Sequence, residues 1–168
     1  PVGLITPWNF PIAIPAWKIA PALAYGNTVV FKPADLVPGS AWELVDILRR
    51  AGLPDGVLNL VMGRGREVGP VLTGAGVDGI TFTGSVLTGE AILASAQPHR
   101  ARVQLEMGGK NPLVVLDDAD LEVAVEVALQ GAFGSTGQRC TASSRLIVTA
   151  GIHDRFVEAL TARMRHWR

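Results

Sequence analysis

The sequence predicts an α/β protein with an open parallel sheet of Rossmann-like type, followed by the start of a second α/β domain. Short apolar runs alternate with single helical patterns along the chain, and strands separated by single helices pair in parallel through right-handed crossovers. The same alternation starts again after the double glycine Gly108 and Gly109. We therefore expect one domain over residues 1–107 and a second over residues 108–168.

The first domain combines strand-like runs with the helical patterns that connect them. The strand-like runs cover residues 3–6, 28–32, 57–61, 79–83 and 103–106. The helical patterns cover residues 16–26, 40–52, 66–74 and 87–96. Ser40 is a typical helix N-cap, and Gly26 and Gly52 are typical residues at which a helix stops.

The second domain begins with the same kinds of element. A strand-like run at 112–116 precedes a long helical pattern at 121–134, and a strand-like run at 145–148 precedes a final helical pattern at 153–168. The chain starts at Pro1 inside an apolar run and stops at Arg168 inside a helical pattern. We therefore expect a fragment of a longer protein, truncated at both ends.

Composition limits the class of protein and its partners. Fifteen basic and fifteen acidic side chains cancel, and 48% of the residues are hydrophobic, which is typical of a globular protein that does not bind nucleic acid. No apolar run reaches the length of about 18 residues that a membrane helix needs. The single cysteine, Cys140, cannot form an internal disulfide, and no secretory signal is evident, so we expect a cytoplasmic protein.

Three unusual turns follow strands of the first domain, where an open parallel sheet binds its ligand. "TPWNFP" contains Trp8 and Asn9, and "FKPAD" contains Lys32 and Asp35. "FTGSVLTG" turns at Gly84 and Ser85 into a helix N-terminus, which offers backbone N–H groups to a phosphate. Together the three turns predict a dinucleotide site.

Two other signals are weaker. "GRGREVG" resembles the dinucleotide fingerprint, but its last glycine comes one residue late and it follows the third strand, so a strand-to-helix turn is favoured. The histidines lack the spacing of metal ligands, and we predict surface positions and no metal site for them: His99, His153 and His166.

Five motifs in order resemble the NAD(P)-dependent aldehyde dehydrogenase superfamily. They are "TPWNFP", "FKPAD", "FTGS", "LEMGGK" and "GQRCTASSR", and the resemblance covers all 168 residues. Those enzymes are about three times longer, so the resemblance implies that this chain is their middle third. It also implies a dinucleotide-binding domain over residues 1–107, the start of the catalytic domain over 108–168, and a parent protein that is a homodimer or homotetramer.

The resemblance implies roles for four catalytic residues. Cys140 matches the nucleophile that attacks the aldehyde carbon, and Asn9 matches the asparagine that stabilises the resulting oxyanion. Glu106 matches the general base that activates the hydrolytic water, and Lys18 matches a lysine proposed for proton relay. Each has an ordinary alternative: a buried small apolar residue for Cys140, a turn residue for Asn9, a solvated residue for Glu106 and for Lys18.

For the cofactor, the resemblance implies NAD or NADP. A carboxylate beside the adenosine ribose suits a free 2′-hydroxyl and favours NAD, although the shorter side chain and the nearby lysine leave NADP open. The matching residues are Trp8, Lys32, Asp35, Gly65, Gly84 and Ser85.

The substrate is predicted to be a small aldehyde. Arg139 directly precedes Cys140, and a guanidinium there suits an aldehyde with a carboxylate or phosphate; alternatively Arg139 points into solvent or pairs with a carboxylate. The motifs most resemble α-ketoglutaric semialdehyde (2,5-dioxopentanoate) dehydrogenases, with non-phosphorylating glyceraldehyde-3-phosphate dehydrogenase as the main rival. A structural protein or an inactive nucleotide-binding fragment is the non-enzymatic alternative, and we expect no turnover from the fragment alone.

Overall fold

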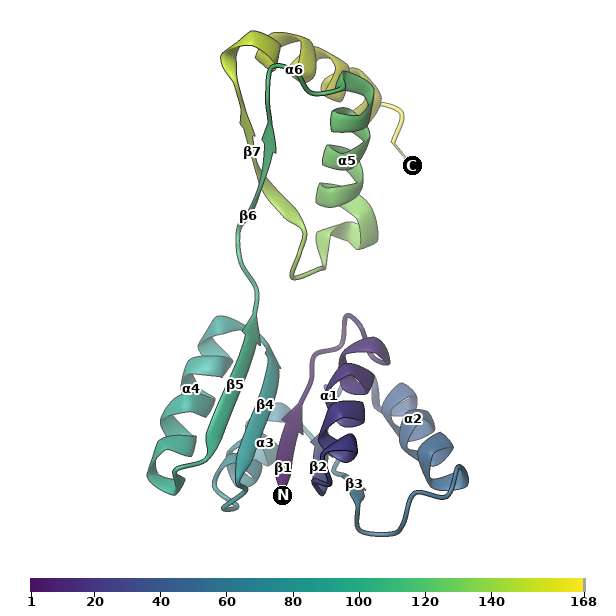
Figure 1. The fold of residues 1–168 in the computed structure, drawn as a ribbon, viewed down its shortest axis with the longest axis vertical. Helices are drawn as coiled ribbons and strands as arrows, with labels where there is room; N and C mark the ends of the chain where they lie inside the picture. Colours follow the sequence, from purple (N-terminus) through teal and green to yellow (C-terminus); the bar gives the residue numbers. More distant parts are fainter. Residues whose placement is uncertain (168) are drawn as a thin grey trace. The chain divides into compact units, whose positions relative to one another are not determined.

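The computed structural model describes residues 1–167, which form two compact units (Figure 1). Unit 1 covers residues 1–107, and unit 2 starts at Gly108. The boundary therefore lies directly before the double glycine. Arg168, the last residue of the final predicted helix, lies outside the described residues.

Unit 1 contains a parallel sheet with the strand order β3-β2-β1-β4-β5. The chain builds one half of this sheet outward from β1, returns, and builds the other half from β4. This arrangement confirms the predicted open parallel sheet and puts β1 at its centre. The strands are β1 Val2–Ile5, β2 Val29–Lys32, β3 Leu58–Leu60, β4 Gly79–Gly84 and β5 Arg102–Met107.

Helices connect the strands of unit 1 and cover both faces of the sheet. Successive residues of a strand point to opposite faces, so neighbouring residues of β1 belong to different buried clusters. Leu4 of β1 lies in one buried cluster with Ile19 and Phe31, whereas its neighbour Ile5 lies in another with Phe82 and Ile92. The helices are α1 Ala13–Ala24, α2 Pro38–Arg50, α3 Gly65–Thr73 and α4 Val86–Ala96, followed by the short 3-10 helix η1 Gln97–His99.

Three predicted helix starts are wrong, since α1 begins at Ala13 rather than at residue 16 and α6 covers Ala150–Met164 rather than residues 153–168. Helix α2 begins at Pro38, with Val37 as its N-cap residue, so Ser40 lies inside the first turn rather than capping it. Proline is well suited to the first helical position because its φ is already helical and its missing N–H would have no partner there. The predicted stops agree with the structure, since Gly26 and Gly52 have φ of +73° and +96° just after their helices.

Unit 2 places helices against a small parallel sheet of β6 and β7. Val115, Leu129 and Phe156 are among the residues that form its buried core. The connection between the two strands contains α5 and the short 3-10 helix η2. The elements are β6 Asn111–Val115, α5 Leu121–Phe133, η2 Gly134–Gly137, β7 Ser143–Val148 and α6 Ala150–Met164.

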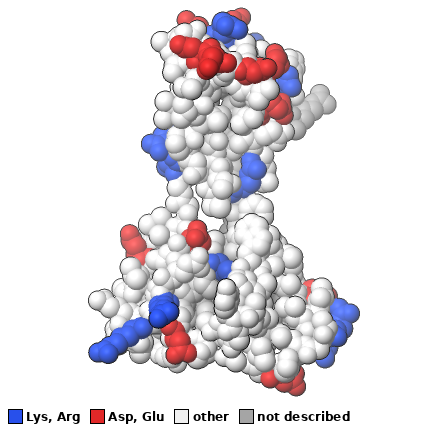
Figure 2. All heavy atoms as spheres, in the orientation of Figure 1, with Lys and Arg blue, Asp and Glu red and all other residues white. Residues whose placement is uncertain are grey.

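The surfaces agree with the balanced charge of the sequence. On the face of unit 1 drawn in Figure 2, basic and acidic side chains are scattered over a mostly uncharged surface. His99, His153 and His166 are exposed, as predicted. Among residues 1–167, no helix is sufficiently long and apolar to cross a membrane.

Candidate functional site

The three predicted turns of unit 1 leave neighbouring strands. Ile5 at the end of β1 is in register with Lys32 of β2 on one side and with Phe82 of β4 on the other. The segments after these strands therefore start from the same edge of the sheet, at the point where the strand order reverses. Open α/β sheets bind their ligands at this position.

Lys32 is a charged residue buried at this edge. Its side chain is 3% exposed, and its Nζ donates to the carbonyl oxygen of Pro33 over 2.8 Å. Burial lowers the pKa of Lys32 below its ordinary value, and the negative charge of Asp35 partly opposes that change. A Cβ at Gly65 would lie 3.9 Å from the Lys32 Nζ, so the glycine leaves space beside the ammonium group.

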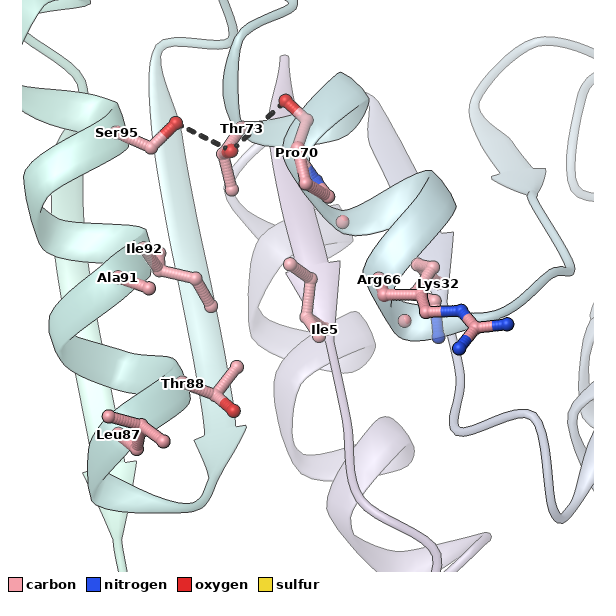
Figure 3. Close-up of a pocket in the computed structure, with 12 residues that line it drawn as sticks. Ile5, Lys32, Arg66, Pro70, Thr73, Leu87, Thr88, Ala91, Ile92 and Ser95 are labelled. Atoms are coloured by element: carbon pink, nitrogen blue, oxygen red, sulfur yellow. Dashed lines mark hydrogen bonds between the residues drawn. The ribbon is translucent and has the colours of Figure 1, made fainter.

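A cavity of about 460 Å³ lies beside Lys32 and Gly65, between α3 and α4. Figure 3 shows Leu87, Thr88 and Ile92 along α4 on one side, and Lys32 and Arg66 on the other, with Ile5 of β1 between them. Most of the walls are apolar, and the cationic groups lie at one end. A flat aromatic base with a phosphate-bearing sugar suits this combination.

The N-terminus of α4 follows β4 directly. Ser85 is its N-cap residue and accepts a hydrogen bond from the backbone N–H of Thr88 over 3.3 Å. The other N–H groups of the first helical turn have no partner within the helix. A Cβ at Gly84 would lie 2.5 Å from the Phe82 ring, so only glycine fits this turn.

These features fit a dinucleotide, because the cavity provides apolar walls and the α4 N-terminus provides N–H groups for a pyrophosphate. Of the predicted cofactor residues, Lys32 and Gly65 line the cavity, whereas Asp35 lines a second hollow together with Arg64. Trp8, 44% exposed, is in the segment between β1 and α1 and is not among the residues that line the cavity in the described chain.

Glu106 and Lys18 belong to one polar cluster in unit 1. The Lys18 Nζ donates to the Thr81 Oγ1 over 2.6 Å, and the Thr81 hydroxyl donates to the Gln104 Oε1. The Gln104 Nε2 in turn donates to the Glu106 Oε1 over 3.3 Å. Burial lowers the pKa of Lys18, and the charge of Glu106 partly opposes that change. Asn9 is in the segment of unit 1 that connects β1 to α1, and its side chain is half-buried.

Cys140 is exposed in the segment of unit 2 that connects η2 to β7. Asn111 at the start of β6 holds this segment, because its Nδ2 donates to the carbonyl oxygens of Cys140 and Ala142 over 2.6 and 3.1 Å. The preceding turn is strained, since Ser135 and Thr136 have φ of +54° and +55°. A non-glycine residue rarely adopts this left-handed conformation, and strained backbone is concentrated near functional groups.

Arg139 contacts backbone rather than a carboxylate. Its Nη2 donates to the carbonyl oxygens of Gln130 and Gly131, in the last turn of α5. The Gln130 carbonyl also accepts from the backbone N–H of Gly134, so the guanidinium is a second donor to this oxygen and ties the Cys140 segment to the end of α5. The contact explains the conformation of Arg139, whereas its role toward a substrate stays a prediction.

The sequence analysis missed the residues that hold the predicted ones in place. Gln104 is two positions before Glu106, and the two-residue period of a strand was a signal that both point to one face. Thr81 and Asn111 had no such signal, because their contacts depend on strand pairing and on the path of a loop.

Comparisons with known proteins agree over the whole chain. The model of the aldehyde dehydrogenase family matches residues 1–168. Alpha-ketoglutaric semialdehyde dehydrogenase of Bacillus subtilis (strain 168) is 55% identical over 163 residues, covering 96% of this chain and 33% of that protein. 2,5-dioxopentanoate dehydrogenase of Saccharolobus solfataricus is 49% identical over 170 residues, covering 99% of this chain and 36% of that protein.

Solved structures give the same result. Betaine aldehyde dehydrogenase from Staphylococcus aureus, in complex with NAD+, superposes with a TM-score of 0.95 at 43% identity, covering 98% of this chain and 33% of that one. The chain thus spans about a third of the length of the relatives that it matches. Since the family model covers every residue and the fold agrees, this chain belongs to the aldehyde dehydrogenase family.

Proposed function

We propose that the full-length protein carrying this chain oxidises 2,5-dioxopentanoate to 2-oxoglutarate with NAD(P)+. The observation that carries this proposal is the name shared by two relatives at 55% and 49% identity, since 2,5-dioxopentanoate is α-ketoglutaric semialdehyde. Family membership supports the reaction class, and the specific names support the substrate.

In the first step, the thiolate of Cys140 attacks the aldehyde carbon and forms a carbon–sulfur bond. The carbonyl electron pair moves to oxygen, and the side-chain amide of Asn9 and the backbone N–H of Cys140 stabilise the resulting negative charge. NAD(P)+ held by unit 1 would supply the acceptor for the hydride that this carbon loses, and Cys140 would then carry the acyl group as a thioester. The exposure of Cys140 and the backbone clamp from Asn111 support a nucleophilic role.

In the second step, Glu106 accepts a proton from water while the water oxygen bonds to the thioester carbon. The carbon–sulfur bond breaks, its electron pair returns to the sulfur of Cys140, and the carboxylic acid leaves. The hydrogen bond from Gln104 supports this role, because it fixes one oxygen of the carboxylate.

We further propose that residues 1–107 are the dinucleotide-binding domain and that residues 108–168 begin the catalytic domain. The features that support the cofactor role all belong to unit 1: the cavity, Lys32, Gly65 and the α4 N-terminus.

The preferred cofactor is NAD. The carboxylate of Asp35 acts on buried Lys32 and disfavours a second negative group beside it, such as a 2′-phosphate.

The test is the kcat/KM of the full-length protein for 2,5-dioxopentanoate, glyceraldehyde-3-phosphate, succinate semialdehyde and an uncharged aldehyde, each with NAD+ and with NADP+. We expect 2,5-dioxopentanoate with NAD+ to give the highest value. Cys140→Ser is expected to lower that value by on the order of 10³, as loss of a nucleophile does in hydrolases of comparable mechanism.

Three outcomes would count against the proposal at different levels. Equal kcat/KM for all aldehydes would contradict the assignment of 2,5-dioxopentanoate as the substrate. A preference for NADP+ would contradict the assignment of NAD as the cofactor. Full turnover in Cys140→Ser would contradict the nucleophilic role of Cys140 and with it the proposed mechanism.

A further inference from the structure

A chain of polar side chains crosses one face of the unit 1 sheet. Gln104 and Glu106 lie two positions apart on β5, and Thr81 is in register with Gln104 on the neighbouring strand β4. Val103 and Leu105, the alternate residues of β5, instead pack against the buried cluster beneath α4. The polar residues therefore share the opposite face of the sheet, and Lys18 of α1 contacts them there.

The three hydrogen bonds that link these side chains all run in the same donor-to-acceptor direction. The ammonium group of Lys18 is only a donor and the carboxylate of Glu106 is only an acceptor, so the two ends fix the orientation of the groups between them. Lys18 donates to Thr81, Thr81 donates to Gln104, and Gln104 donates to Glu106. Hydrogen bonds aligned in this way polarise one another in the same sense.

We propose that Thr81 and Gln104 are positioning residues that hold the Glu106 carboxylate for hydrolysis of the thioester. This inference rests on the proposed function, in which Glu106 is the general base. Glu106 is exposed in unit 1, and an unrestrained glutamate side chain populates many rotamers. The hydrogen bond from Gln104 selects among those rotamers, and Thr81 fixes Gln104 from the other side.

This series of hydrogen bonds does not relay protons from Lys18 to Glu106. A carboxamide nitrogen would have to lose a proton and its oxygen gain one, which is unfavourable for glutamine at neutral pH. Lys18 therefore acts on Glu106 through orientation and charge. Its lowered pKa is consistent with a group held at a desolvated position, close enough for the charge of Glu106 to oppose that effect.

The ordinary alternative is a set of surface hydrogen bonds that has no effect on catalysis, since Gln104 and Glu106 are both exposed in unit 1. Under that alternative, removal of either bond changes neither chemical step. The two chemical steps therefore distinguish the alternatives, because a positioned general base matters for hydrolysis more than for formation of the thioester.

The experiment is a single-turnover assay of the full-length protein with 2,5-dioxopentanoate and saturating NAD+. Reduced nicotinamide reports formation of the thioester, and rapid acid quenching reports the covalent acyl group that remains. Gln104→Met and Thr81→Val remove the hydrogen-bonding groups at nearly constant size, and Thr81→Ser keeps the hydroxyl. Gln97→Met and Thr161→Val are matched controls at exposed residues that take no part in the hydrogen bonds of the cluster.

We expect hydrolysis of the acyl-enzyme to slow about tenfold in Gln104→Met and about threefold in Thr81→Val, with thioester formation and the KM for NAD+ unchanged. Thr81→Ser and both controls should hydrolyse the acyl-enzyme at the wild-type rate. Hydrolysis within twofold of wild type in both Gln104→Met and Thr81→Val would overturn the inference.

Glu106→Gln separates this inference from the function beneath it. If Glu106→Gln blocks hydrolysis while Gln104→Met and Thr81→Val do not, the proposed function stands and the positioning role is wrong. If Glu106→Gln hydrolyses the acyl-enzyme normally, or the wild-type protein forms no thioester, the proposed function fails and the positioning role fails with it.

Discussion

Lys32 combines a structural cost with a proposed role in cofactor binding. Its ammonium group is almost fully inside unit 1, with the carbonyl of Pro33 as a hydrogen-bond partner. Burial disfavours the charged form, and the lowered pKa of Lys32 is the sign of that cost. Such a group is retained where its charge meets a ligand, and here it lines the cavity.

The pH dependence of stability follows from this lowered pKa. Between the lowered pKa and the unfolded-state value of about 10.4, the unfolded chain binds more protons than the folded one. The free energy of unfolding of the wild type, relative to Lys32→Met, should therefore rise as pH increases through that window, and calorimetry at a series of pH values up to about 10.5 measures it. Parallel curves for the two proteins would contradict the buried charge.

Asn111 has a comparable role in unit 2, because one side chain holds two backbone carbonyls of the Cys140 segment. In Asn111→Ala these bonds are lost, and we expect kcat/KM of the full-length protein to fall about tenfold, which corresponds to about 1.4 kcal/mol, one to two hydrogen bonds. The dissociation constant for NAD+ should not change. Asn59→Ala, which removes a comparable clamp on Gly56, is the control and should change kcat/KM less than about twofold.

At the scale of the elements, helix termini carry much of the local order. Helix α5 begins after Asp120, whose Oδ1 accepts from the backbone N–H of Val123 over 3.1 Å. At its other end, the Gln130 carbonyl accepts from the backbone N–H of Gly134 and from the Arg139 Nη2. Because α5 links β6 to the Cys140 segment, both of its ends influence how that segment is presented.

Loss of the N-cap should loosen α5 locally. Asp120→Ala removes the acceptor and should cost about 1 kcal/mol, which corresponds to about fivefold faster hydrogen exchange in the first turn of the helix. Asp120→Asn keeps an acceptor oxygen and should exchange at nearly the wild-type rate. Hydrogen-exchange mass spectrometry over residues 120–128 measures both, and equal exchange in all three proteins would show that the cap contributes nothing.

At the scale of the whole molecule, we expect cofactor binding to stabilise the folded state of unit 1. A ligand in the cavity between α3 and α4 contacts elements from both halves of the sheet, since α3 precedes β4 and α4 follows it. Such a ligand binds only the folded unit. At about 100 times its dissociation constant, it stabilises that unit by about 2.7 kcal/mol.

A bulky residue in the cavity should abolish this stabilisation. Ala91 lines the cavity, whereas Ala94 lies on the same helix and is exposed. We expect NAD+ to raise the melting temperature of the wild-type protein and of Ala94→Phe, and to have no effect on Ala91→Phe. Scanning calorimetry with and without NAD+ measures this. An equal rise in all three proteins would place the cofactor elsewhere.

The sequence by itself determined the elements, the parallel sheet and the family. Alternation of apolar runs with helical patterns and the glycine stops are local signals, so residues 1–107 could be assigned to an open sheet. Local signals also misled at Ser40, where Pro38 started the helix earlier.

Only the tertiary structure decided which side chains meet. The series of hydrogen bonds that links the side chains of Lys18 and Glu106 depends on the strand register that pairs Thr81 with Gln104. The hydrogen bonds from Asn111 to the Cys140 segment depend on the path of a loop. Arg139 likewise contacts the carbonyls of Gln130 and Gly131 because the path of the chain after α5 brings its guanidinium back to the end of that helix. Contacts between residues distant in sequence depend on packing, and packing is not encoded in the spacing of any single motif.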